Sequence, residues 1–222
     1  MQEDKQIEML ALEISNQEMQ VPPGTTLLNL VTVLEQDFPY PILGAKYNGE
    51  IVDLYTEVNT SGKIELIDIT SEEGMRIYRQ SLVFLLARAV YELFPQRKLM
   101  VQHSLGKSYY CEFKGMDYIS PLDLIALEAK MKEFVEAEEP IIPQYLSREI
   151  ALRMLLAQGH EEKVALLENL DYQKIRIYTS GPYSNYSYRI LAPDMGRLKV
   201  FRLEAYAQGF LLRFPDSLNP QQ

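Results

Sequence analysis

The chain has 222 residues, a hydrophobic content of 47% and a formal net charge of −9. The hydrophobic content is typical of a globular protein and excludes general disorder. The acidic balance argues against broad, nonspecific binding of nucleic acid, which depends on neutralising phosphates. A single cysteine, Cys111, excludes an internal disulfide and is typical of a reducing cytosol. Because the N-terminus is acidic and no apolar run approaches about 20 residues, we expect a cytoplasmic protein with neither a signal peptide nor a membrane span.

The first 70 residues predict a small sheet packed by one helix. Residues 6–15 and 18–21 read as a pair of strands, and Thr25 can cap the helix that follows. Asn48-Gly49 between two short apolar runs predicts a tight hairpin, and residues 63–69 predict a closing strand. The expected helix has one apolar face, made of Leu27, Leu30, Val31, Leu34 and Phe38.

Residues 74–94 predict a long central helix, after a polar hinge at 71–74. Apolar residues recur at helical spacing and define a core face: Leu82, Leu85, Leu86, Ala89 and Leu93. A second stripe steps by one helical turn along another face: Arg76, Gln80, Phe84 and Arg88. This second stripe suits packing and binding but holds no obvious catalytic acid, base or metal ligand.

The rest of the chain predicts helices mixed with strands. Ser120-Pro121 followed by Asp123 is typical of a helix start, and Ser147 begins a further helix that Gly159 ends. A short helix is expected at 161–168. The expected strands are residues 98–103, 108–114, 174–180, 185–191, 198–204 and 209–214. Together these elements predict an α+β fold.

Several motifs resemble the N-terminal part of bacterial threonyl-tRNA synthetases. They are the run from Tyr47 to Ser81, HSLGKSYYCEF at 103–113, GHEEKVALL at 159–167 and LAPDMGRLKVFRL at 191–203. The resemblance covers nearly the whole chain. It implies a TGS domain of ubiquitin-like β-grasp fold at residues 1–70, followed by an editing-type α+β domain at residues 71–215.

The resemblance breaks at the chemistry of the editing site. Where the family has two histidines four residues apart, this chain has Gln80 and Phe84. Where the family has a cysteine and a histidine before a proline, alignment on Pro193 gives Ser187 and Leu191. The resemblance therefore implies no catalytic residue. It implies a degenerate ligand-binding pocket made of these residues with Lys163, which matches a pocket lysine, and Asn185, which replaces an aspartate.

A second set of motifs resembles bacterial nucleoside kinases of the uridine kinase type that carry a synthetase-like N-terminal region. The motifs are RQSLVFLL at 79–86, HSL at 103–105 with YCE at 110–112, and GFLLRFP at 209–215. No phosphate loop of the form G-x-x-x-x-G-K-[ST] occurs in the sequence. This resemblance implies that residues 216–222 are a linker to a missing kinase domain. ATP and magnesium would belong to that domain, and no cofactor is expected in this segment.

The candidate residues also have ordinary structural interpretations. Gln80 and Phe84 either line a remodelled pocket or pack on a helix whose old site has closed. Lys163 either holds an anion or is an exposed lysine on a short helix. The two histidines, His103 and His160, have no partner at metal spacing, so we expect no metal site.

The tyrosines near the C-terminal strands allow two interpretations as well. They are Tyr178, Tyr183, Tyr186 and Tyr188. Their rings could form a stacking platform for a base, or they could be ordinary sheet formers, which is the interpretation we favour.

Our leading hypothesis is a non-catalytic ligand-binding or regulatory region of a nucleoside kinase. The expected partners are the C-terminal kinase domain and a small polar ligand such as a nucleoside, nucleotide or amino acid, favoured over nucleic acid. One alternative is a threonyl-tRNA synthetase-like editing or tRNA-binding domain, which as an active hydrolase would keep Lys163 and use substrate-assisted chemistry. Another is a protein- or ribosome-interaction module, which rests on fold analogy alone.

Overall fold

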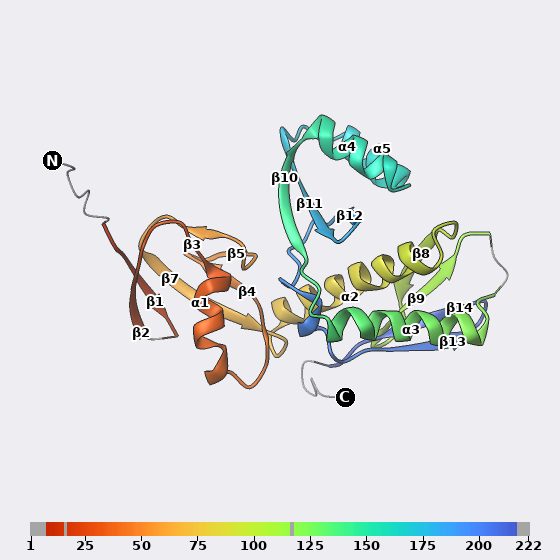
Figure 1. Ribbon diagram of the computed structural model, residues 1–222, viewed down its shortest axis with the longest axis horizontal. Helices are drawn as coiled ribbons and strands as arrows, with labels where there is room; N and C mark the ends of the chain where they lie inside the picture. The colour runs from red at the N-terminus through yellow and green to blue at the C-terminus, as the bar shows by residue number, and fades with distance from the viewer. Residues whose placement is uncertain (1–7, 16, 116–117, 217–222) are drawn as a thin grey trace.

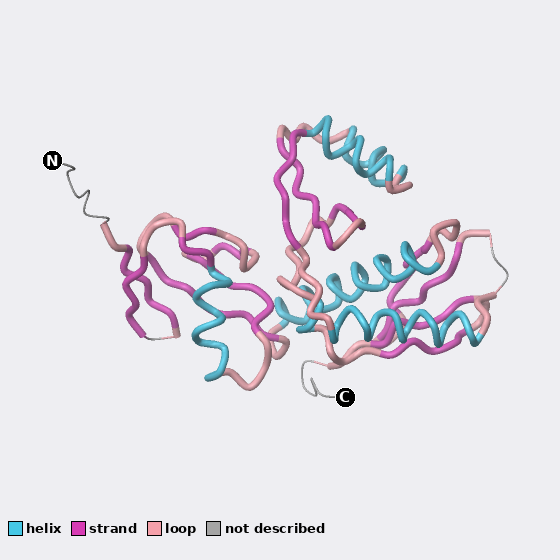
Figure 2. Tube along the Cα trace, viewed as in Figure 1, coloured by secondary structure: helices cyan, strands magenta, loops and turns pink. Residues whose placement is uncertain are grey.

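A computed structural model of the chain describes residues 8–15, 17–115 and 118–216, and it has the predicted α+β character. Figure 1 shows an N-terminal sheet with one helix, a long helix that leads away from it, and a C-terminal part in which two sheets carry helices. Figure 2 separates these parts by secondary structure, with an arm of strands and short helices standing apart from the long helices. None of the helices in the described ranges is long and apolar enough to cross a membrane.

The N-terminal part is a five-stranded sheet in the order β2-β1-β7-β4-β5. Its strands are β1 (Leu10–Ile14), β2 (Gln17–Val21), β4 (Ile42–Tyr47), β5 (Glu50–Val52) and β7 (Gly62–Asp68). β1 and β7 run parallel in the middle of the sheet, and the other pairs are antiparallel. Helix α1 (Leu27–Leu34) buries its predicted apolar face against the sheet and continues as a 3₁₀ turn, η1 (Glu35–Asp37).

The hairpin predicted at Asn48-Gly49 is confirmed. Both residues have positive φ, +50° and +88°, as the favoured two-residue turn between antiparallel strands requires. The predicted helix cap is wrong by one residue. Thr26 is the N-cap and its hydroxyl accepts from the Asn29 amide at 3.3 Å, whereas the Thr25 hydroxyl donates to the Pro22 carbonyl.

The pairing of β3 (Thr25–Thr26) with β6 (Glu57–Val58) was not predicted, because two residues are too few to give a periodic pattern. The strand expected at 6–15 begins at Leu10 in the structure. Residues 6 and 7 lie outside the described ranges, and residues 8 and 9 are not in a strand.

Helix α2 (Glu72–Leu93) begins within the segment that we expected to be a hinge. The Ser71 hydroxyl accepts from the Gly74 amide at 3.0 Å, so this polar segment is the capped first turn of the helix. A Cβ at Gly74 would lie 1.6 Å from the Asp68 carbonyl oxygen. Only glycine therefore allows the end of β7 to approach the start of α2 so closely.

The C-terminal part packs α2 and α3 (Pro121–Glu136) on a four-stranded antiparallel sheet, in the order β13-β14-β9-β8. Its strands are β8 (Leu99–Ser104), β9 (Ser108–Phe113), β13 (Arg202–Tyr206) and β14 (Gly209–Arg213). Ser120 caps α3 as predicted. Cys111 is fully buried in this core, which raises the pKa of its thiol to about 12.

The arm carries the remaining sheet, in the order β10-β11-β12, and two helices with a small core of their own. Its elements are β10 (Ile142–Ser147), α4 (Arg148–Ala157), α5 (Glu161–Glu168), β11 (Lys174–Ser180) and β12 (Tyr183–Tyr186). β10, which contains Pro143, was not predicted. The structure places it at a sheet edge, where proline is tolerated.

The strand expected at 185–191 is wrong beyond Tyr186. From residue 187 the chain leaves the sheet, and the Ser187 hydroxyl donates to the Arg189 carbonyl at 2.8 Å. A following 3₁₀ turn, η2 (Met195–Arg197), returns to the N-terminal part. The strand expected at 198–204 therefore begins only at Arg202.

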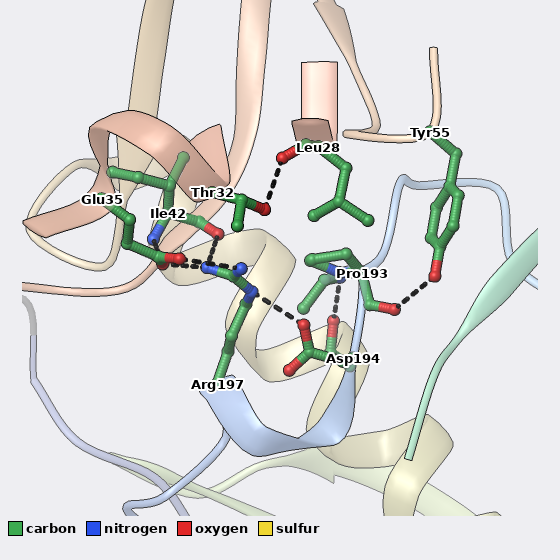
Figure 3. A network of polar contacts seen from close by, with 10 residues as sticks. Leu28, Thr32, Glu35, Ile42, Tyr55, Pro193, Asp194 and Arg197 are labelled. Atoms are coloured by element: carbon green, nitrogen blue, oxygen red, sulfur yellow. Dashed lines mark hydrogen bonds and ion pairs between the residues drawn. The ribbon is translucent and has the colours of Figure 1, made fainter. Parts of the chain in front are cut away.

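An ion network joins η2 to the N-terminal part (Figure 3). The Arg197 guanidinium donates to both carboxylate oxygens of Glu35, to the Ile42 carbonyl at 2.9 Å and to Asp194 at 2.9 Å. Nearby, the Tyr55 hydroxyl donates to the Pro193 carbonyl at 3.1 Å. Burial opposes the charge on Arg197, but its bonds to Glu35 and the field of Asp194 outweigh that effect and raise its pKa. The guanidinium therefore stays charged and bridges two segments 162 residues apart in sequence.

We expect Arg197→Ala to destabilise the protein by about 3–5 kcal/mol, because it removes one partner of a largely buried ion network and leaves two carboxylates unpaired. Chemical denaturation would measure the change. Arg153→Ala is the matched control, since Arg153 is exposed and pairs with an exposed Glu149 one helical turn away. Equal unfolding midpoints for the two variants would contradict a stabilising role for the network.

Candidate functional site

The most distinctive side chain among the candidates is Lys163, in the first turn of α5. Its amine donates to the Asn185 side-chain oxygen at 2.6 Å and to the Tyr186 carbonyl at 2.9 Å, both on β12. Burial lowers the pKa of Lys163 to about 8, and the Glu162 charge opposes that shift. The helix and the strand therefore hold a cation in fixed position that is still mostly charged at neutral pH.

Asn185 connects Lys163 to a group of aromatic rings. Its side-chain amide donates to the hydroxyl of Tyr183, which is 2% exposed. The Tyr183 ring lies 5.2 Å from Phe84 and 5.4 Å from Tyr91, both on α2, in tilted pairs. The arm is thus anchored to α2 by aromatic packing around Tyr183.

A cavity of about 440 Å³ opens beside this group, between α2, β8 and the arm. Lys163 and Asn185 line it from the arm, and Val83, Ala87 and Tyr91 line it from α2. Its walls thus combine apolar side chains with a few polar groups, as small-molecule sites do.

The structure places the other candidate residues outside this cavity lining. Phe84 is 4% exposed and lies behind Tyr183. Leu191 is buried at 1% exposure, and its backbone amide donates to the Tyr178 hydroxyl at 3.3 Å. Ser187 is buried too, with its proton donated to a carbonyl, and Gln80 is half-buried on α2. Lys163 and Asn185 therefore meet in one cavity, while Phe84, Ser187 and Leu191 are buried outside its lining.

Sequence reasoning missed two polar features of the cavity. The His160 ring faces Tyr183 edge-on, and its Nε2 lies 3.2 Å from the Ser184 carbonyl. Burial and the nearby Lys163 charge lower the pKa of His160 to about 4, so the ring is neutral and Nε2 is the donor. Lys98 lies 2.9 Å from Glu162 at the rim. In the sequence, His160 could have been found from its position three residues before Lys163, just ahead of the start of α5.

The tyrosines near β12 do not form a stacking platform together. Tyr178 and Tyr183 are buried in the core, and Tyr186 is half-buried. Tyr188 alone among these four is largely exposed, at 66%. Most of the group are therefore core and sheet residues, as we favoured.

The arrangement suits binding better than hydrolysis. His160 is a weak base because its conjugate acid has a pKa of about 4, and the Ser187 hydroxyl has no base beside it in the contacts of the described residues. No group of three or more His, Cys, Asp or Glu side chains in those residues could hold a metal ion. A positioned cation beside apolar walls remains, which can hold a carboxylate, a phosphate or another polar end of a ligand.

Comparison with known proteins relates the chain to threonine–tRNA ligases. It is 31% identical over 190 residues to the enzyme of Symbiobacterium thermophilum, a match that covers 85% of this chain and 29% of the relative. Threonine–tRNA ligase 1 of Bacillus subtilis is 30% identical over 188 residues, covering 84% and 29% respectively. No family model matches the chain. The similarity is to the N-terminal region of these enzymes, and the chain spans a little under a third of their length.

We expect Phe84→Ala to lower the free energy of unfolding by about 3–5 kcal/mol, because the ring is almost fully buried against Tyr183. Leu122→Ala, at a side chain that is 78% exposed, should change it by less than about 0.5 kcal/mol. Urea denaturation would compare the two variants. A small effect for Phe84→Ala would mean that the ring lines an adaptable pocket instead of a packed core.

We expect His160 to make stability fall as the pH drops from about 6.5 to about 4. The folded pKa is lowered to about 4, whereas an unfolded histidine titrates near 6.5, so in this window the unfolded chain binds the extra proton. The contribution cannot exceed about 1.4 kcal/mol per pH unit. Unfolding curves across the window should be flatter for His160→Gln than for the wild type. His103→Gln, at an exposed histidine, should keep the wild-type slope; if both variants flatten it equally, the assignment to His160 is wrong.

Proposed function

We propose that the chain is a non-hydrolytic binding unit built like the N-terminal region of a threonyl-tRNA synthetase. In this proposal residues 1–70 are a β-grasp TGS domain, and residues 71–215 are an editing-type domain whose site has become a binding pocket. The supporting observation is the Lys163 amine, held by Asn185 and the Tyr186 carbonyl at the edge of a 440 Å³ cavity. The similarity to threonine–tRNA ligases supports a synthetase-like unit over a nucleoside kinase region or a docking module.

The cavity suits a ligand with one anionic or strongly polar end and an apolar or planar body. Its volume lies within the range of about 300–1,000 Å³ that is usual for small-molecule sites. Lys163 would meet the polar end, and the half-buried Tyr91 and Val83 would contact the body. The names of the relatives make threonine and the aminoacylated end of tRNA the first ligands to test.

Retained editing activity is the main alternative. It would need a base or a bound water activated by the substrate itself, with Lys163 holding the substrate. The geometry disfavours it, because Phe84 and Leu191 carry no exchangeable proton and are buried. Losing general acid–base help typically lowers a rate by a factor of about 10²–10⁴.

A second and less supported candidate is that the chain is the N-terminal region of a nucleoside kinase. It rests on the motifs at 79–86, 103–112 and 209–215, and the relatives named above do not support it. A phosphate loop in the sequence that follows Gln222 would support the kinase, whereas synthetase motifs there would support the first proposal. A protein- or ribosome-docking role rests on fold analogy alone and ranks below both.

We expect no hydrolysis of seryl- or threonyl-tRNA above background. We also expect a raised melting temperature with threonine, seryl-tRNA or threonyl-tRNA, because a ligand that binds only the folded state stabilises it. Lys163→Met should abolish the shift while keeping the aliphatic stem, and Lys199→Ala, which removes an exposed lysine, should retain it. Rapid deacylation that Lys163→Met abolishes would show an active editing site. If none of these ligands raises the melting temperature, the binding proposal fails and the pocket is closed and structural.

A further inference from the structure

A second cavity, of about 430 Å³, lies between the N-terminal sheet, the first turns of α2 and the chain around β11 and β12. It shares no lining residue with the Lys163 cavity. Its lining is Ile51, Glu73, Arg76, Ile77, Arg176, Tyr188, Arg189 and Ile190. Three arginines thus face one glutamate, in a chain whose net charge is −9.

Arg176 is the most deeply placed of the three arginines. Its guanidinium lies 3.7 Å from Asp53 and donates to the Tyr188 carbonyl at 3.5 Å, and both of these contacts are long. Its Nε is buried without a partner, a feature that several other arginines of the described residues share. The cavity is therefore distinguished by its three grouped arginines, and the unpaired Nε of Arg176 carries no weight of its own.

The other two arginines make no buried ion pair among the described residues, although the Arg189 guanidinium lies over the Tyr188 ring, 5.1 Å from its centroid. Arg76 pairs with Glu72 at 2.9 Å, an exposed contact along the helix surface that contributes little to stability. The Nε of Arg189 donates to the Tyr188 hydroxyl at 3.2 Å, and no carboxylate of the described residues lies within ion-pair distance of it. Both guanidinium groups can therefore turn toward an anion without breaking a buried ion pair.

The remaining walls of the cavity are apolar or aromatic. Ile77 and Ile190 pack closely on β4, where a Cβ at Gly44 would lie 2.8 Å from Ile190 and 3.2 Å from Ile77. This close approach fixes the floor where the N-terminal sheet meets α2. Tyr188 is 66% exposed, so much of its ring is accessible to a ligand. An aromatic ring beside guanidinium groups is the combination that binds a base and its phosphate.

We propose that this cavity is a nucleotide site in which Arg76, Arg176 and Arg189 hold a phosphate and the Tyr188 ring stacks on the base. Guanidinium groups match phosphate geometry because each can donate two parallel hydrogen bonds. The inference goes beyond the proposed function, since it concerns a different cavity and does not need Lys163.

Isothermal titration calorimetry with AMP, adenosine and a short single-stranded RNA tests the proposal on the full chain. We expect AMP to bind at least about tenfold more tightly than adenosine, and its affinity to fall with added salt. Arg189→Ala and Arg76→Ala should each weaken AMP binding about tenfold or more, because each removes charge-assisted hydrogen bonds. Thermal melting checks that both variants fold, which their exposed positions favour. Arg176→Ala is avoided because it would leave the buried Asp53 without its cation.

Two controls make the result specific. Arg153→Ala removes the same charge from a distant exposed helix and should leave AMP affinity unchanged. Lys199→Ala, which removes an exposed lysine outside both cavity linings, should also leave it unchanged. If the RNA binds more tightly than AMP, the phosphate that the site holds belongs to an RNA strand. If AMP binds more tightly, the ligand is a free nucleotide. Equal affinity for AMP and adenosine, equal losses in Arg153→Ala and Arg189→Ala, or no binding of AMP or RNA would overturn the proposal.

Discussion

Burial of α2 is the constraint on which the rest of the structure depends. Its apolar residues contact the end of the N-terminal sheet through Leu43 and Ile67, and they contact α3 and the antiparallel sheet along most of the remaining length. A helix that is covered on several faces can be stable only when all of these elements are in place. The segments on either side of it are therefore coupled, although the N-terminal sheet keeps a core of its own.

The Arg197 network restricts how η2 and the N-terminal part can lie relative to each other. Apolar packing tolerates sliding, whereas a guanidinium bonded to two carboxylates and a carbonyl accepts few relative positions. The network also determines where η2 lies, and hence the course of residues 187–194 between β12 and η2. Both cavities have walls from the chain around β12. The Arg197 network, by holding η2, therefore contributes to the shape of each cavity.

The two cavities place different polar groups on one scaffold. At the first, Phe84 and Leu191 are buried in the interior, and Lys163 with its amide partner lies at the edge. At the second, cations gather where the N-terminal sheet meets α2. In both places the polar side chains come from segments far apart in sequence.

Local signals in the sequence determined much of the secondary structure. Ser120 caps α3, Asn48-Gly49 turns β4 into β5, and α5 spans the expected residues, because caps and turns depend on a few adjacent backbone groups. Only the tertiary structure decided which candidate residues meet. Lys163 and Asn185 are 22 residues apart, and the arginines of the second cavity come from α2, β11 and the segment after β12. Strand β10 and the end of β12 were likewise decided by partners distant in sequence, since sheet pairing supplies the hydrogen bonds that a proline-containing or irregular segment cannot form alone.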